Sequence, residues 1–445
     1  MQSPRDLWSE NSPTVLMAGN RGCMSSSGVR RMDMLDAPTL SPTKRPSEAL
    51  HVRVAPTFAA LEVSRQEWDD VLVRLGGSIY MSYDWVKTWW EFYGEGKTLR
   101  VFVFSVADEI VGILPIYIEC LRLWPLRFLV ARLVGANIPP KVFDPPLHRA
   151  WAVPILERVI AHLITKDGCD AFSLGPVSET CVSSDLMSKV CLEESKQVSG
   201  FLESSADVHS VWALPPSLEQ YYASLSRNER KNRKSDFKQL QNEYGTRVEV
   251  VRDPQGLEAA FEVFVQQHAA QWRFEGKAGH FGAWPQALEF NRALVRAHGR
   301  LGRARFIRIL AKDQVIASLY VFAFGGCYYC ELPARSTDPE WSQFSLGPAG
   351  IVATIDAAIR EGITTMEGGL AHYDYKRRLG AKEYAIRTFR IIAPPGWSPV
   401  RSWVFNTLKF CLHNIYHKVW YRRITPFLPA GFRKPLWRLW LRFDF

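Results

Sequence analysis

The sequence predicts an α/β fold with a mixed sheet, in which one domain occurs twice. Segments with a helical period alternate with segments whose apolar residues alternate as in strands, and some neighbouring strands form antiparallel hairpins. This order is typical of a mixed sheet covered by helices. The chain of 445 residues is also too long for one compact domain. The third observation is a β-hairpin that recurs 205 residues further along the chain.

Residues 1–50 are expected to be disordered. They are rich in Ser, Pro, Arg and Met and have no apolar period, so they cannot bury enough surface to offset the entropy lost on ordering. They have no apolar stretch after a basic start, which argues against a secretory signal. A start codon at Met32 or Met34 and a transit peptide are the alternatives.

The composition indicates a cytoplasmic globular protein. Apolar residues make up 47% and charged residues 22% of the chain, both ordinary values for a globular protein. No apolar run is long enough to span a membrane as a helix. The eight cysteines are scattered, and without an export signal they are expected to be reduced thiols.

The first half is predicted to begin with one or two core helices and a hairpin. Apolar and aromatic residues repeat at helical spacing between Trp68 and Tyr93. The period then changes to two, which predicts a strand at 99–104, a turn at 107–109 and a returning strand at 110–118.

The same hairpin is predicted in the second half, at 305–310, 312–314 and 315–324. Arg100 aligns with Arg305 and Asp108 with Asp313, both pairs being 205 residues apart without a gap. A repeat of this length indicates two copies of a domain and not a solenoid unit. A chance likeness between two hairpins is the alternative.

Further helices and strands of the second half follow from the same periods. Helices are expected at 218–244, 254–271, 285–298 and 348–361, and strands at 327–332 and 385–392. We therefore divide the chain into a disordered segment 1–50, a first domain 51–205, a second domain 206–398 and a tail 399–445.

The tail is the main source of the net charge of +10. Residues 401–445 hold nine Lys or Arg and one acid, Asp444, and so contribute +8 of it. An apolar stripe is formed by Val404, Leu408, Leu412, Ile415 and Val419. Apolar and Trp surface on one side and cations on the other suit a helix lying in a membrane interface. Docking on the protein's own surface is the alternative.

A candidate anion site lies where the helix expected at 348–361 begins. Gly347 and Gly350 bracket Pro348 there, close to Ser345. Glycine lets a ligand approach the backbone, and the exposed N–H groups of a first helical turn attract anions. A pyrophosphate would fit, although an ordinary helix start would show the same short pattern.

Titratable side chains gather after a strand that ends at Met366-Glu367-Gly368-Gly369. His372 is a candidate general base, Lys376 could stabilise developing charge, and Tyr375 is a candidate substrate-binding residue. A solvated loop is the alternative. Glu331, at the end of the preceding strand, is a further candidate for accepting an acceptor's proton.

A basic face is expected on the helix that contains SRNERKNRKSDFK. Arg227, Lys231, Lys234 and Lys238 are spaced by 4, 3 and 4 residues and so share one side. Such a face suits an anionic acceptor such as a nucleotide-linked sugar or a phospholipid. RNA or plain solvent would suit it too.

No metal site is expected. Cys327 and Cys330 have CxxC spacing, but no second Cys or His pair lies at ligand distance. Walker A, HExxH, GxSxG and post-strand GxGxxG sequences do not occur, which argues against kinase, metalloprotease, hydrolase and dinucleotide-binding functions.

Several of these segments together resemble a known family. SYDWVKTWWEFYG, IVGILPIYI and VFDPPL resemble the N-terminal half of GNAT-superfamily acetyltransferases of the cellulose- or exopolysaccharide-biosynthesis type (CelD/BcsL-like). SRNERKNRKSDFKQLQNEYG, WSQFSLGPAG and MEGG…YDYKRRLG resemble its C-terminal half. That family is similar to the Fem-type aminoacyltransferases, which are built from two GNAT domains.

The resemblance implies tandem GNAT-like domains, of which the second binds acetyl-CoA or another acyl-CoA with Ser345, Gly347 and Gly350 at the pyrophosphate. Lys376 falls where the Fem-type family has a functional lysine. Arg227, Arg230 and Arg233 match the family's basic, substrate-binding helix. The chain departs from the usual R/Q-x-x-G-x-G/A signature, because Gln343 precedes Gly347 by four residues.

These observations predict an N- or O-acyltransferase that acts on an envelope- or polysaccharide-related acceptor. A strand N–H would polarise the thioester carbonyl, and a residue near His372 or Glu331 would deprotonate the acceptor. The alternatives are transfer of an aminoacyl group from tRNA, with the basic helix on RNA, and a non-catalytic scaffold at the membrane. We expect the protein in the cytoplasm, with contact to the inner membrane through 400–445.

Overall fold

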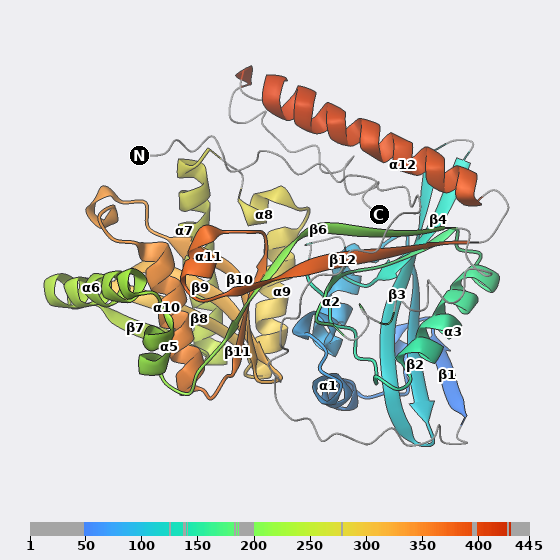
Figure 1. The fold of residues 1–445 in the computed structure, drawn as a ribbon, viewed down its shortest axis with the longest axis horizontal. Coiled ribbons are helices and arrows are strands. Elements are labelled where there is room, and N and C mark those ends of the chain that lie inside the picture. The colour runs from blue at the N-terminus through green and yellow to red at the C-terminus, as the bar shows by residue number, and fades with distance from the viewer. Residues whose placement is uncertain are drawn as a thin grey trace, which may run out of the picture.

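The computed structural model describes residues 49–123, 126–136, 139, 141–181, 184, 186, 200–276, 279–393, 398–424 and 427–428. Nearly all of the segment predicted to be disordered lies outside these residues. Figure 1 shows two halves side by side, joined by long central strands and overlain by a helix near the C-terminus.

The first half contains helices packed on a set of antiparallel and parallel strands. Its strands are β1 (Leu50–Ala55), β2 (Thr98–Val106), β3 (Glu109–Leu123), β4 (Leu126–Leu133), β5 (Ala171–Ser178) and β6 (Gly200–Ala213), and its helices are η2 (Phe58–Ala60), α1 (Arg65–Arg74), η3 (Ile79–Met81), α2 (Tyr83–Tyr93) and α3 (Ala152–Thr165). The helical segment predicted between Trp68 and Tyr93 is thus mainly the two helices α1 and α2.

The second half has the same kind of alternation. Its strands are β7 (Arg247–Val251), β8 (Ala304–Ala311), β9 (Gln314–Phe324), β10 (Cys327–Arg335), β11 (Thr365–Leu370) and β12 (Lys382–Ile392), and its helices are α5 (Leu218–Ser224), α6 (Arg227–Tyr244), α7 (Pro254–Phe274), α8 (His280–Ala283), α9 (Ala287–Arg300), η4 (Pro339–Trp341), α10 (Leu346–Arg360) and α11 (Asp374–Arg378). The tail forms α12 (Ser398–Asn414) and the π-helix η5 (Ile415–Ile424).

Within the described residues, the named strands form one mixed sheet of 12 strands, whose order is β1-β2-β3-β4-β5-β12-β6-β11-β10-β9-β8-β7. Counted inward from the two edges of the sheet, β1 to β5 correspond in order to β7 to β11. The innermost strands are exchanged, because β12 lies next to β5 and β6 lies next to β11. β6 pairs with β11 of the second half, and β12 pairs with β5 of the first. The two pair with each other in the middle (Figure 1). The predicted mixed α/β fold is confirmed, and the boundary expected at 205–206 falls inside β6.

The hairpins β2–β3 and β8–β9 have identical registers. Val106 pairs with Glu109 and Ala311 with Gln314, and both hairpins carry a register shift at the same step, after Phe104 and after Ile309. Each of these positions is displaced by the 205 residues seen in the sequence.

The aligned arginines also make equivalent contacts. Arg100 donates to the carboxylate of Asp167, which follows α3, and Arg305 donates to Glu361, which follows α10. Each guanidinium also donates to the carbonyl of the residue before it. The repeat therefore extends from the hairpins to the packing of the helix beside them.

One expected element is different in the structure. Residues 218–244 form two helices, α5 and α6, instead of one. Leu225 and Ser226 are extended, and the Ser226 hydroxyl caps α6 by accepting a hydrogen bond from the Glu229 N–H at 3.3 Å. Serine is one of the preferred N-cap residues. The break is not visible in the sequence, because one capping serine does not interrupt the helical period of the segment.

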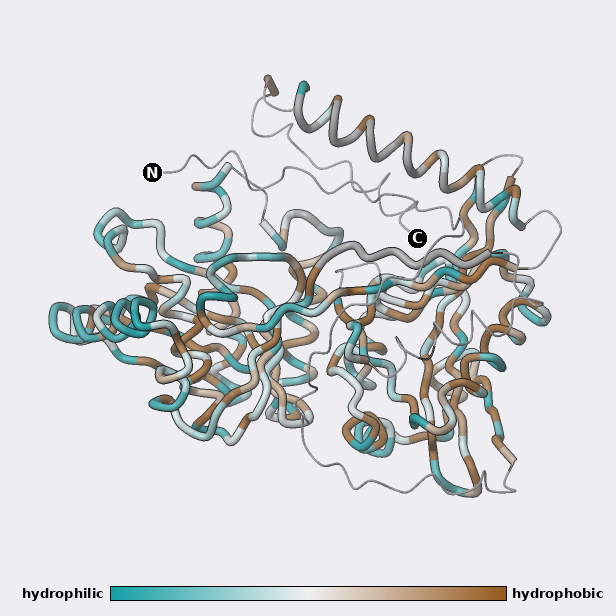
Figure 2. Tube along the Cα trace, in the orientation of Figure 1, coloured by the Kyte–Doolittle hydropathy of each residue, from teal (hydrophilic) through white to brown (hydrophobic). Residues whose placement is uncertain are grey.

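The halves share a core between them. Trp85 of α2 is buried and packs edge-on against Phe290 of α9 and Phe322 of β9, with ring centroids 6.1 and 5.7 Å apart. Figure 2 shows apolar residues along the strands and an almost wholly hydrophilic α6. The contacts of Trp85 fix the first half against the helices of the second.

The tail begins by docking on the first half. Phe405 of α12 is fully buried and stacks on Phe128 of β4 with ring centroids 5.1 Å apart. Ser398 and Arg401 donate to the carboxylate of Asp170. In the part of the chain that the structure describes, no helix is long and apolar enough to cross a membrane.

We predict that Phe405→Ala releases α12 from β4. The buried ring is the main apolar anchor, and its removal should cost about 3–5 kcal/mol of docking free energy. Limited trypsin digestion should then cleave after Arg401 much faster. Trp403→Ala is the control, because that side chain is 68% exposed. Equal cleavage rates in the two variants would contradict the docking role.

Candidate active site

The parallel strands β10 and β11 pair over a short stretch and then part. Their register runs from Cys327 opposite Thr365 to Tyr329 opposite Glu367, whereas β10 continues to Arg335 and β11 to Leu370. Ligands of open α/β sheets commonly bind beyond the carboxyl ends of parallel strands. The parting of β10 and β11 is therefore a natural place for a substrate.

The equivalent strands of the first half part as well, but there the chain fills the space. β4 and β5 pair only from Val130 to Arg132 on the β4 side. Further along β5, Phe143 forms a parallel bridge with Val177, and its N–H donates to the Pro176 carbonyl at 2.8 Å. Among the described residues no isolated bridge closes the parting of β10 and β11 in this way.

The two glycines of the candidate anion site have different surroundings. A Cβ placed on Gly347 would meet no atom within 4 Å, whereas one on Gly350 would lie 2.7 Å from Cδ1 of Leu319 on β9. Gly347 is thus the open position in the first turn of α10, and Ser345 precedes that helix as its N-cap. Gly350 faces the sheet, where its missing side chain lets α10 pack against β9.

The predicted basic face of α6 is exposed. Arg227, Lys231, Lys234 and Lys238 are all accessible to solvent. The helix lies beside α10 and α11, because Asp236 is hydrogen-bonded to Ser345 and Arg378 pairs with Glu229 at 3.8 Å. These contacts use the side of α6 that carries Glu229 and Asp236, so the four cations lie on the opposite, solvent-facing side of the helix.

The three arginines expected to bind substrate do not share one environment. Arg227 is exposed and Arg230 is half-buried. Arg233 is buried, and its guanidinium pairs with Glu229 at 3.4 Å and Asp236 at 3.0 Å. Arg233 therefore braces α6 from within, and the two arginines before it remain available to a ligand.

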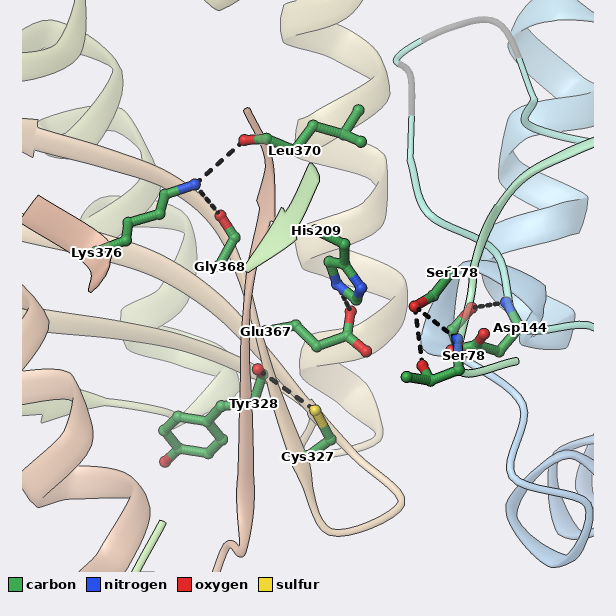
Figure 3. Close-up of polar contacts among 11 residues, drawn as sticks. Ser78, Asp144, Ser178, His209, Cys327, Tyr328, Glu367, Gly368, Leu370 and Lys376 are labelled. Atoms are coloured by element: carbon green, nitrogen blue, oxygen red, sulfur yellow. Dashed lines mark hydrogen bonds and ion pairs between the residues drawn. The ribbon is translucent and has the colours of Figure 1, made fainter. Parts of the chain in front are cut away.

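Lys376 is buried, and its ammonium is occupied by the backbone. It donates to the carbonyls of Gly368 and Leu370 at 2.9 and 3.2 Å (Figure 3) and to that of Ala371 at 3.4 Å. The turn needs this support, because Gly369 and Ala371 both have left-handed backbone angles, with φ of 70° and 78°. The predicted charge-stabilising lysine thus shapes the end of β11.

His372 is exposed beside this turn, whereas Tyr375 is half-buried against the core of the second half. The His372 side chain is 49% exposed, and its Nδ1 lies 2.8 Å from the Glu383 carboxylate. Burial raises the pKa of Tyr375 to about 12. Its ring lies 5.6 Å from that of Tyr373, centroid to centroid.

Glu331 lies just past the point where β10 leaves β11, at an irregularity in the β9–β10 register. Bulges of this kind commonly redirect a side chain next to an active site. The Glu331 carboxylate is only 3% exposed and forms an ion pair with Lys141 of the first half. Lys141 also lies 5.3 Å from the ring of Tyr80. The pKa of Tyr80 is raised well above its ordinary value by burial and then by the charge of Glu331.

A second charged cluster was not found from the sequence. His209 of β6 lies 3.2 Å from the carboxylate of Glu367, the last residue of β11 that pairs with β10 (Figure 3). Asp144 of the first half faces the pair, and Ser78 holds its backbone through two hydrogen bonds. Asp144 and Glu367 stood in the VFDPPL and MEGG segments, but nothing in the sequence around His209 signals this role.

No group of three or more His, Cys, Asp or Glu side chains suited to a metal ion occurs among the described residues. Cys327 is buried, and Cys330 is half-buried, both as free thiols.

We predict that Lys141→Met destabilises the protein by about 3–5 kcal/mol, because it leaves the buried Glu331 carboxylate without its counter-charge. Urea denaturation would measure the loss. The double variant Lys141→Met/Glu331→Gln should recover most of it, since no unpaired charge remains. Equal unfolding free energies for Lys141→Met and the parent would show that the pair is solvated.

The comparisons with known proteins concern one segment of the second half and the overall fold. Residues 227–377 match the family described as the acetyltransferase (GNAT) domain. No curated protein sequence matches the chain. The crystal structure of FemX has the same fold, with a TM-score of 0.55 and 12% identity over 75% of this chain and 96% of that one.

Two further solved structures are more distant. They are L-PGS from Bacillus licheniformis, with a TM-score of 0.44 and 10% identity over 78% of this chain and 97% of that one, and a tandem GNAT protein from the clavulanic acid biosynthesis pathway, with 0.38 and 12% over 78% and 100%. The second half thus contains a segment that matches the GNAT acetyltransferase domain, within a two-half α/β fold, and this match supports an acyltransferase.

Proposed function

We propose that the protein transfers an acetyl or another acyl group from acyl-CoA to an amine or hydroxyl group of an envelope- or polysaccharide-related acceptor. The observation that carries the proposal is the parting of β10 and β11 inside the segment that matches the GNAT domain. The corresponding position of the first half is filled by Phe143. The second half is therefore the proposed donor-binding half.

The first turn of α10 is the proposed phosphate site. Pro348 has no N–H and the Leu346 N–H donates to the Phe344 carbonyl at 3.0 Å, so the Gly347 N–H is the donor of this turn that a ligand could use, and the helix dipole adds a partial positive charge. Gly347 leaves room for a ligand to come close to the backbone. Arg227 and Arg230, on the neighbouring α6, would add charge-assisted contacts to an anionic acceptor.

Glu331 is the proposed proton acceptor of the transfer. Its carboxylate is buried beside the parting strands and is held there by its ion pair with Lys141. A free N–H of β10 beyond Tyr329 would polarise the thioester carbonyl, since this part of the strand is not paired with β11. Lys376 would keep the turn after β11 in shape.

The proposal for the acceptor rests on the resemblance to the CelD/BcsL-like type and on the exposed cations of α6. Anionic acceptors such as nucleotide-linked or lipid-linked sugars would suit this surface. The same face would suit an aminoacyl-tRNA, which is the second candidate donor because the fold is shared with FemX.

We predict that acetyl-CoA binds the purified protein and that Gly347→Trp abolishes this binding. The indole would fill the space that the backbone of α10 leaves open. Isothermal titration calorimetry measures both affinities. Gln66→Trp is the matched control, because Gln66 is exposed at the same position of the first turn of α1.

The proposal fails if neither acetyl-CoA nor longer acyl-CoAs bind the parent protein. Strong, salt-sensitive tRNA binding would then favour the aminoacyl-tRNA alternative. Loss of binding in Gln66→Trp as well as in Gly347→Trp would place the donor somewhere other than the start of α10.

We also propose that the tail binds an anionic membrane surface from the cytoplasmic side. Apart from the buried Phe405, large apolar side chains of the tail are exposed, among them Trp403 at 68%, Ile415 at 56% and Phe427 at 86%. The basic residues of the tail would face anionic headgroups. Docking and membrane contact thus use different faces of one segment.

We predict that the protein cosediments with vesicles containing phosphatidylglycerol and that the double variant Trp403→Ser/Ile415→Ser loses most of this binding. Val263→Ser/Phe274→Ser is the control, since these residues of α7 are also exposed but lie outside the tail. Unchanged sedimentation of the tail variant would contradict the membrane proposal, and acetyl-CoA affinity should not change in either variant.

A further inference from the structure

His209 differs from the other deeply buried histidines. Burial lowers the pKa of His298 to about 3, and it also lowers that of His268. Burial acts on His209 in the same direction, but the charges of Glu367 and Asp144 outweigh it, and the pKa of His209 is raised. Glu367 and Asp144, which come from separate segments of the chain, thus favour the protonated form of a buried imidazole.

Hydrogen-bonding atoms in this cluster are left over. His209 is 2% exposed and its Nε2 faces Glu367, while its Nδ1 has no hydrogen-bond partner among the described residues. Oδ1 of Asp144 is likewise buried without a partner. Native proteins provide hydrogen-bond partners for most buried polar atoms. The two atoms without such partners, Nδ1 of His209 and Oδ1 of Asp144, therefore indicate a place for a polar ligand.

The cluster adjoins the parting strands. Glu367 is the residue at which the pairing of β10 with β11 ends. His209 lies opposite Leu370 in the β6–β11 register, further along the same edge. Figure 3 shows His209 and Glu367 on one side and Asp144 with Ser78 on the other, across the junction of the halves. A group held there would lie beside the proposed donor thioester.

The charges of the cluster favour a cationic group. Lys376 is the cation that also acts on His209. With both carboxyl groups ionised, a neutral His209 leaves one negative charge without a counterpart. An ammonium group would cancel that charge in a site of low polarity. A hydroxyl would have to develop an alkoxide beside two carboxylates, which is unfavourable.

We propose that the Asp144–His209–Glu367 cluster is the acceptor subsite, that it takes a primary amine, and that His209 Nδ1 accepts the first proton of that amine. The proposal rests on the proposed function and names the class of acceptor for the same site. It also makes the first half a contributor to the active site, through Asp144.

The proposed step balances as follows. The ammonium loses one proton to Nδ1 of His209 and becomes a free amine, which attacks the thioester carbonyl. The C–N bond forms and the C–S bond breaks, with its electron pair remaining on sulfur. Glu331 takes the second nitrogen proton and passes it to the thiolate. The proton on His209 returns to solvent through Asp144, which is the most exposed member of the cluster.

The cluster predicts a pH dependence. His209 must be neutral to accept a proton, so amine transfer should rise with pH through the raised pKa of His209. Glu367 on β11 and Asp144 on the first half raise that pKa, and Lys376 on α11 opposes them. Glu367→Gln or Asp144→Asn removes a negative charge, so the acidic limb of the pH profile should move to lower pH in either variant.

The test uses the full chain and two small probes of equal size, n-propylamine and n-propanol. Release of free thiol from acetyl-CoA is followed between about pH 6 and 9, the range around the ordinary histidine pKa. We expect the amine, and not the alcohol, to stimulate thiol release. His209→Gln should lower the stimulated rate by about 100-fold or more, the usual contribution of a general base.

His298→Gln is the matched control. His298 is also fully buried and its ring nitrogens also lack hydrogen-bond partners among the described residues, but its charged neighbour is Arg303 and not a carboxylate. The control should keep amine-stimulated release. A positioning role alone would leave the pH profile of Glu367→Gln unshifted.

Failure of this inference is distinct from failure of the proposed function. A protein that does not bind acyl-CoA contradicts the proposed function itself. A protein that binds acetyl-CoA contradicts the amine subsite if propylamine does not stimulate release, if propanol stimulates it equally, or if His209→Gln retains the parental rate.

Discussion

The exchange of β6 and β12 is the constraint on which the rest of the molecule depends. Each half completes its sheet with a strand from the other, and these two strands pair with each other over most of their length. β6 and β12 are each paired on both sides, so neither leaves a row of unsatisfied backbone groups at an exposed edge. Neither half can therefore close its sheet alone, and residues from both are brought to the line where they meet.

This constraint explains how a duplicated fold can carry one site. The two parallel strand pairs part in the same way, but the segment around Phe143 fills the parting of the first half. The same segment carries Lys141 to Glu331 and Asp144 to the His209–Glu367 pair. The segment that fills the space between β4 and β5 in the first half thus also supplies two of the charged residues beside the parting of β10 and β11.

The repeat and most elements could be predicted from the sequence, because hairpin registers and helical periods are local signals. The displacement of 205 residues recurs in the pairing and in the shift after Phe104 and Ile309. The break at Ser226 was missed because an N-cap serine inside a long polar helix resembles any other exposed serine. Both glycines of the α10 start looked alike, and only the contact with Leu319 separates Gly350 from Gly347.

The site was predictable only in part, for a related reason. Glu331 lies late in a strand, Lys376 follows one, and Gly347 lies in the first turn of a helix, which are positions that a sequence can mark. The partners that define their chemistry come from far along the chain: Lys141 for Glu331, and Asp144 with His209 for Glu367. Such pairs depend on the exchange of β6 and β12, and no spacing within the chain encodes them.

The charges at the junction argue for chemistry and against a purely structural role. Taking an ion pair out of water costs several kcal/mol per ion, and apolar side chains of similar size commonly stabilise an interior better. The junction already has an apolar core around Trp85 to hold the halves together. Two buried charged clusters beside the parting of β10 and β11 weaken that core. Their position at the strand ends is what an acid–base site for acyl transfer requires, because proton acceptors must be held close to the thioester and shielded from water.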